Sequence, residues 1–155
     1  MSDHMPERVL ASSFSGTLNW REAIQLACRP LREADLVPEA FAESILSSVD
    51  KYGPHFILTP GIALPCSQDE FIPASAVALS VLAVDPPVSF DPDDPACAAD
   101  LFVVAAAKDA ETAQQLTDLL IRRLRDSEAA LQMKEAARKE DADSIASLIQ
   151  SGLFL

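Results

Sequence analysis

The hydrophobic pattern of this chain changes its period twice, and this change constrains the fold more than any other feature. Apolar residues first recur at helical spacing, as in Phe41 and Ile45. Between residues 56 and 106 they form short runs separated by Pro, Gly, Ser and Asp, which is typical of strands. Helical spacing then returns, with Leu116 and Leu120 on one stripe. This order predicts a single α/β domain, in which a mixed central sheet is flanked by helices on both faces.

Local signals set the expected boundaries. Asn19 and Glu22 have the spacing of a capping box, which predicts a helix start, and Gly53 is placed to end the second helix. The segment 85–95 contains four prolines and four aspartates, so we expect a surface loop there.

The expected strands span residues 56–58, 62–64, 77–84 and 101–106. The expected later helices begin at Asp109 or Thr112, at Ser127 and near Asp141. The expected organisation is an N-terminal arm at 1–18 with a short strand at 8–11, one domain at 8–150, and a C-terminal end at 151–155.

The 155-residue chain is acidic, and the distribution of its charge bears on function. Its 12 Lys and Arg residues stand against 24 Asp and Glu residues, and the net charge of −12 disfavours binding to nucleic acid or to an anionic membrane surface. No Lys or Arg lies between residues 52 and 107, whereas seven acidic residues do. A phosphate site in that stretch would need positive charge from elsewhere in the chain.

The sequence also lacks several common signatures. Its three cysteines are widely spaced and form neither a disulfide framework nor a zinc pattern. No secretory signal opens the chain, and no apolar run reaches the ~18 residues that span a bilayer. With four glycines there is no glycine-rich phosphate loop, and no residues have metal-ligand spacing. We therefore expect a cytoplasmic protein without membrane insertion, nucleic-acid partner, metal or cofactor.

Few residues could carry chemistry. His4 lies in the N-terminal arm, and His55 follows a helix end, where a half-exposed turn residue is the alternative interpretation. Cys28 falls on the apolar stripe of the first helix, and Cys97 lies in an acidic loop, where carboxylates weaken a thiol as a nucleophile. Cys66 directly follows a strand-like run and a proline, so we expect its thiol to emerge at a strand end, where substrates often bind.

A resemblance to a known family rests on residues 52–68, which read YGPHFILTPGIALPCSQ. This segment resembles the signature of the enzyme IIA components of the bacterial sugar phosphotransferase system, in the ascorbate-type branch of the mannitol/fructose class. The segments WREAI at 20–24 and PVSF at 87–90 resemble other parts of the same family. The resemblance covers about residues 8–150 and implies the fold of that family. It also implies a phosphoryl carrier between the phosphocarrier protein HPr and an enzyme IIB, and leaves a homodimer open.

The resemblance also assigns the site. Cys66 falls where the family has its phospho-accepting histidine, and Gln68 follows where the family usually has arginine. The second family histidine corresponds to Ala113, with Gln114 beside it. His55 is the nearby group that could assist Cys66, if the fold brings it close. The resemblance thus implies a phosphotransferase-like site with non-standard residues.

Three interpretations remain open. In the first, Cys66 replaces the histidine and accepts the phosphoryl group, although a free thiol is only a few per cent ionised near neutrality and Asp69 and Glu70 disfavour its ionisation. In the second, the chain is a non-phosphorylatable relative that binds a partner and regulates it. In the third, Cys66 is a redox-sensitive or inert thiol on a stable domain.

Overall fold

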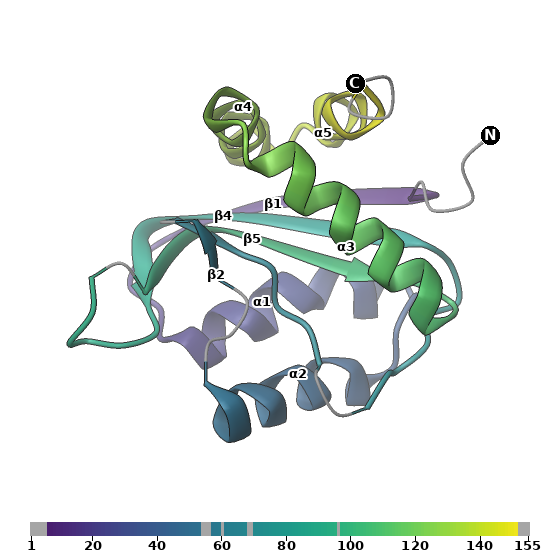
Figure 1. Ribbon diagram of the computed structural model, residues 1–155, viewed down its shortest axis with the longest axis horizontal. Coiled ribbons are helices and arrows are strands. Elements are labelled where there is room, and N and C mark those ends of the chain that lie inside the picture. Colours follow the sequence, from purple (N-terminus) through teal and green to yellow (C-terminus); the bar gives the residue numbers. More distant parts are fainter. Residues whose placement is uncertain (1–5, 54–56, 60, 68–69, 96, 152–155) are drawn as a thin grey trace.

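A five-stranded mixed sheet forms the centre of the protein (Figure 1). The computed structural model describes residues 6–53, 57–59, 61–67, 70–95 and 97–151. The strands lie in the order β1-β4-β5-β3-β2. Pairing is parallel between β1 and β4 and between β3 and β5, and antiparallel between β4 and β5 and between β2 and β3. The strands are β1 (Arg8–Ser15), β2 (Ile57–Thr59), β3 (Gly61–Ala63), β4 (Ala78–Ser89) and β5 (Ala98–Ala106).

Helices cover both faces of this sheet, so the predicted fold class is confirmed (Figure 1). One face packs against the first two helices, and the other packs against the last three. Because side chains alternate along a strand, Phe102 of β5 packs on the first face and its neighbour Leu101 on the second. The helices are α1 (Trp20–Glu33), α2 (Glu39–Tyr52), α3 (Ala110–Leu124), α4 (Ser127–Arg138) and α5 (Ala142–Ser151).

Local chemistry explains where these elements begin and how they pack. The predicted capping box is present, because Asn19 Oδ1 accepts from the Glu22 amide at 2.8 Å and Glu22 Oε1 accepts from the Asn19 amide at 3.0 Å. A hydrogen bond to α1 also offsets the cost of burying the Ser80 hydroxyl in the sheet. Ser80 of β4 is fully buried, and its Oγ donates to the carbonyl of Ala27 in α1 at 2.6 Å.

Two expectations about the strands are wrong. β1 does not end at residue 11 but continues to Ser15, because its whole length pairs with β4. The segment 85–95 is not a loop throughout, since β4 continues to Ser89. The prolines are tolerated because the register shifts between Ala83 and Val88, and Val88 then pairs with Ala99.

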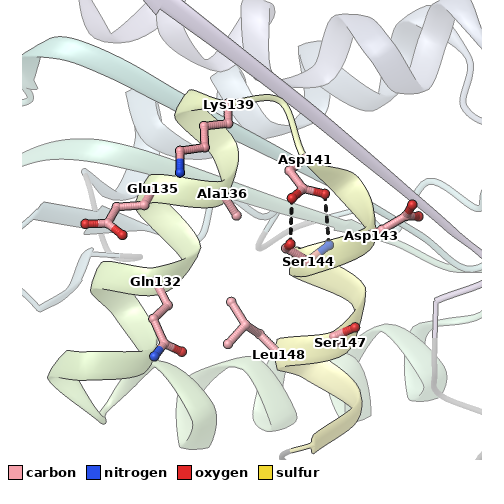
Figure 2. Close-up of a pocket in the computed structure, with 9 residues that line it drawn as sticks. All are labelled: Gln132, Glu135, Ala136, Lys139, Asp141, Asp143, Ser144, Ser147 and Leu148. Carbon is pink, nitrogen blue, oxygen red and sulfur yellow. Dashed lines mark hydrogen bonds between the residues drawn. The ribbon is translucent and has the colours of Figure 1, made fainter.

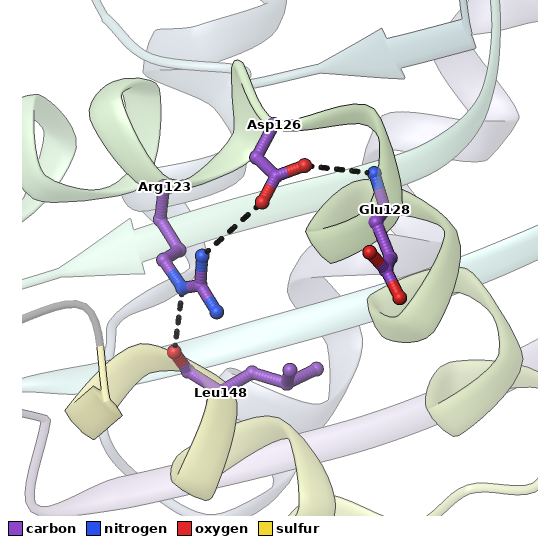
Figure 3. A network of polar contacts seen from close by, with 4 residues as sticks. All are labelled: Arg123, Asp126, Glu128 and Leu148. Atoms are coloured by element: carbon purple, nitrogen blue, oxygen red, sulfur yellow. Dashed lines mark hydrogen bonds and ion pairs between the residues drawn. The ribbon is translucent and has the colours of Figure 1, made fainter.

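Helix α5 is capped at its start and hydrogen-bonded to α3 near its end. At its start, Asp141 accepts from the Ser144 amide at 3.1 Å and from the Ser144 hydroxyl at 2.6 Å (Figure 2). Near its end, Arg123 of α3 donates from Nε to the Leu148 carbonyl at 3.0 Å (Figure 3). The guanidinium also lies 3.8 Å from a carboxylate oxygen of Asp126. The Arg123 contact joins α5 to α3, and α5 also packs against β1.

Candidate functional site

The parallel pairing of β3 with β5 places Cys66 beside helix α3. Parallel strands end at the same edge of a sheet, and the segments that follow them meet there. β3 leads through buried Leu64 and Pro65 to Cys66, while β5 leads to the start of α3. A cavity of about 390 Å³ lies between these segments and α2. Its lining residues are Phe41, Ser44, Ile45, Pro65, Cys66, Ser67, Glu70, Phe71, Ile72, Ala105, Ala110, Ala113, Gln114 and Thr117.

Three of the five candidate site residues line this one cavity. Cys66 is half-buried at the end of the β3 segment, and Ala113 and Gln114 come from the first turns of α3. The side chain of Gln114 donates to Asp118 at 2.9 Å, one turn further along the helix. The other two candidates, His55 and Gln68, lie outside the described residues, as do His4 and Asp69.

The cavity is poor in positive charge. Among its lining residues, all of which the structure describes, there is no Lys, Arg or His, and the single charged side chain is that of Glu70. The nearby N-terminus of α3 is capped by Asp109, whose side chain accepts from the Thr112 amide at 2.7 Å. That hydrogen bond from the backbone of Thr112 lowers the pKa of Asp109, so the helix end carries its own anion.

A cluster of serine hydroxyls connects α2 to the residue after Cys66. Ser67 Oγ accepts from the Ser44 hydroxyl at 2.5 Å and from the Glu70 amide at 3.3 Å. Ser48, fully buried one turn beyond Ser44, has its Oγ 3.4 Å from the same atom. The sequence reasoning did not single out these serines. The signal available was the spacing of Ser44 and Ser48, which puts two hydroxyls on one side of the predicted helix.

The other two cysteines lie outside this cavity. Cys28 is 2% exposed in α1, and burial raises the pKa of its thiol to about 12, which confirms that it is a buried small residue. Partial burial, followed by the charges of Asp94 and Asp91, raises the pKa of Cys97. The expected effect of the acidic loop on Cys97 is therefore present, although burial is its larger cause.

A larger hollow of about 600 Å³ lies between α4 and α5 (Figure 2). Asp141 is occupied with Ser144 at the start of α5, and Lys139 and Glu135 lie on the exposed rim. In the part of the chain that the structure describes, no group of three or more His, Cys, Asp or Glu side chains is arranged to hold a metal ion. The described helices include none that is long and apolar enough to cross a membrane.

The fold and this site define the class of protein. Residues 14–151 match the family described as phosphoenolpyruvate-dependent sugar phosphotransferase system, EIIA 2, and the chain belongs to that family. The ascorbate-specific phosphotransferase system EIIA component of Escherichia coli K12 is 30% identical over 123 residues. That match covers 78% of this chain and 77% of the relative.

Solved structures of the same kind share the fold. The mannitol-specific cryptic phosphotransferase enzyme IIA of Escherichia coli superposes with a TM-score of 0.69 at 23% identity, over 97% of this chain and 95% of that one. Enzyme IIA for mannitol from the same organism, solved in complex with phosphorylated enzyme IIB, superposes with a TM-score of 0.68 at 18% identity, over 97% of both chains. That enzyme IIA thus forms a complex with an enzyme IIB.

Proposed function

We propose that this protein is a cytoplasmic phosphoryl carrier of the sugar phosphotransferase system, with Cys66 as the accepting residue. It would take the group from HPr and pass it to an enzyme IIB. One observation carries the proposal: Cys66 and Ala113, the two positions that the resemblance assigns to histidines, line the same cavity. The ascorbate-specific relative supports a substrate of the ascorbate, mannitol and fructose class.

The chemistry requires the thiolate of Cys66. The thiol first loses its proton to solvent. The sulfur lone pair then forms an S–P bond as the bond between phosphorus and the donor breaks, and the electron pair of that bond stays on the donor. Transfer to enzyme IIB reverses these roles, and the thiolate is regenerated. Throughout, the three equatorial oxygens of the phosphoryl group carry negative charge, which carriers of this kind usually meet with cations or hydrogen-bond donors.

The charge of the cavity sets the expected rate. Removal of one well-placed transition-state donor costs about 2.7–4 kcal/mol, or roughly a hundredfold to a thousandfold in rate. The described lining offers no cationic side chain, and Glu70 adds a negative charge. We therefore expect phosphorylation of Cys66 to be slow.

The lack of cationic side chains in the described lining favours a second candidate function. A relative that binds an enzyme IIB or another partner without accepting phosphate would keep the fold and need no cation in the cavity. In that case Cys66 is a bystander on the binding face, and the cavity serves recognition only.

Intact-mass measurement after incubation with phospho-HPr at mild pH distinguishes the two. A gain of one phosphoryl group that is lost in Cys66→Ser and retained in Cys97→Ser supports the carrier. No gain in the wild-type protein removes it. The double variant Cys66→His with Ala113→His then tests the docking surface. Brisk phosphorylation of that variant shows that HPr still binds, and its absence shows that the surface has diverged as well.

A further inference from the structure

Strand β1 is an edge of the described sheet, and alternate backbone groups along it have no partner among the described strands. β4 is its one neighbour in the described sheet. The Arg8 amide donates to Val77 at 3.3 Å, and the Gly16 amide donates to Asp85 at 2.9 Å. Because backbone groups alternate in direction along a strand, the even-numbered residues of β1 bond to β4. The odd-numbered residues therefore direct their N–H and C=O groups outward; these are Val9, Ala11, Ser13 and Ser15.

The strand itself lacks the sequence features that usually protect an edge. Exposed edge strands are normally short, carry charges, prolines or bulges, or are covered by a helix or loop. Helix α5 packs against one face of β1. β1 is eight residues long, pairs with β4 in continuous register, and has neither proline nor charge from Val9 to Ser15. By contrast, β2 at the opposite edge spans three residues. Phe14 adds an apolar side chain that is 38% exposed.

We propose that a second copy of this chain pairs with β1 in antiparallel fashion, with the two-fold axis at Ser12. In this register the outward groups of Val9 meet those of Ser15 in the second copy, and those of Ala11 meet those of Ser13. Leu10 faces Phe14 of the other copy across the strands, twice by symmetry, and such apolar cross-strand pairs stabilise a sheet. Every outward hydrogen-bonding group of β1 gains a partner.

The hydroxyl of Ser12 favours a second copy over an unrelated strand. Ser12 Oγ is shielded from solvent and has no hydrogen-bond partner among the described residues. On the two-fold axis it directly faces its own symmetry mate, in a non-hydrogen-bonded pair whose Cα atoms lie about 4.5 Å apart. A change of rotamer then allows one hydroxyl to donate to the other. A foreign strand would need a matching polar residue at this one position.

Charge opposes this contact and limits its strength. Each copy has a net charge of −12, and Glu140 accepts a hydrogen bond from the Ser13 hydroxyl at 3.3 Å, close to the axis. Two paired strands also form a small contact in comparison with a standard interface of ~1,600 Å². We therefore expect a reversible dimer that grows with protein concentration and with salt, because salt screens the repulsion.

The dimer is independent of the proposed activity. β3 leads to Cys66, and β4 and β5 separate it from β1 in the sheet. The Cys66 cavity of each copy therefore stays open when the two β1 edges pair. Loss of dimerisation consequently leaves the accessibility of Cys66 unchanged. Failure of one proposal can be told from failure of the other.

Sedimentation velocity over a range of concentrations, combined with residue-resolved amide exchange, tests the proposal. We expect the amides of Val9, Ala11, Ser13 and Ser15 to exchange fast in the monomer and slowly in the dimer, while that of Leu10 is slow in both. The Ala11→Pro substitution removes an outward N–H without breaking the bonds to β4, and we expect it to abolish the dimer.

Phe14→Ser provides a second variant if the proline impairs folding. It should weaken the dimer, whereas Leu131→Ser, which removes another exposed apolar side chain, on α4, should not. A protein that stays monomeric at high concentration and salt overturns the proposal. So does a dimer in which the odd-numbered β1 amides still exchange fast, or one that survives both β1 substitutions.

Discussion

The Ser44 hydroxyl on α2 donates a 2.5 Å hydrogen bond to Ser67, the residue that follows Cys66. The Ser67 oxygen also accepts from the Glu70 amide at 3.3 Å. Through these contacts the helix joins the segment 65–67 and Glu70, which line the same cavity. The position of the Cys66 thiol therefore depends on a neighbouring residue that is itself held from two sides.

Replacement of Ser67 by alanine should destabilise the protein and loosen the Cys66 segment. The Ser44 hydroxyl would lose this acceptor but keep the Glu70 carbonyl at 3.1 Å, and the exposed Glu70 amide would lose its bond to Ser67. Loss of such a hydrogen bond costs about 0.5–1.5 kcal/mol. Urea unfolding measures the loss, and the rate of Cys66 alkylation reports the loosening. Ser147→Ala, at an exposed site on α5, is the matched control. Equal stability of the two variants would contradict this role for Ser67.

A cation placed in the cavity should stabilise the negative charge of the Cys66 thiolate and of a bound phosphoryl group. Ala113→Lys puts an ammonium group where the described lining has none, which favours the thiolate of Cys66 and stabilises the phosphoryl oxygens. We expect faster Cys66 alkylation at neutral pH and at least about tenfold faster phosphorylation by phospho-HPr.

Gln115→Lys is the control for this change, since it adds the same charge at an exposed position that does not line the cavity. Faster alkylation without phosphorylation would favour the partner-binding candidate. If the two lysine variants behave alike, the local charge of the cavity does not limit the thiol.

The buried thiol of Cys28 should make stability depend on pH in the alkaline range. Burial raises its pKa from 9.0 to about 12. Because the unfolded chain releases this proton at lower pH than the folded chain, the contribution is complete below pH 9 and is lost as pH rises toward about 12.

Urea unfolding at a series of pH values measures this dependence. In Cys28→Ala the alkaline fall in the free energy of unfolding should become shallower, while Cys97→Ser, which removes a more exposed thiol, should retain most of it. Parallel curves for the wild-type protein and Cys28→Ala would show that the thiol is not the source.

Arg123 should matter for stability far more than its neighbour Arg122. The Arg123 side chain is 15% exposed and donates to the Leu148 carbonyl at 3.0 Å (Figure 3). Hydrogen bonds from charged groups contribute about 1.5–3 kcal/mol, so Arg123→Ala should lower the free energy of unfolding by about that amount. It should also speed amide exchange in α5. Arg122 is exposed, and Arg122→Ala should change neither quantity; equal effects would refute the assignment.

The regular elements were largely predictable, because their signals are local. The capping box at Asn19 and Glu22 and the apolar stripe of α3 depend on residues within a few positions of one another. The extension of β4 past Asp85 was not predictable, because prolines suggest a loop unless a register shift accommodates them. The length of β1 likewise depends on β4, which follows more than sixty residues later.

The candidate site combines features of the sequence with features of the fold. The sequence by itself determined an acidic α/β domain, a family signature around Cys66, and the absence of Lys and Arg from 52 to 107. Only the tertiary structure brought Cys66 to Ala113, placed the α2 serines beside Ser67, and left β1 as an open edge. The physical reason is that helical and strand periodicity arises from neighbouring residues, whereas cavities and sheet edges arise from strand order, which depends on contacts between distant parts of the chain.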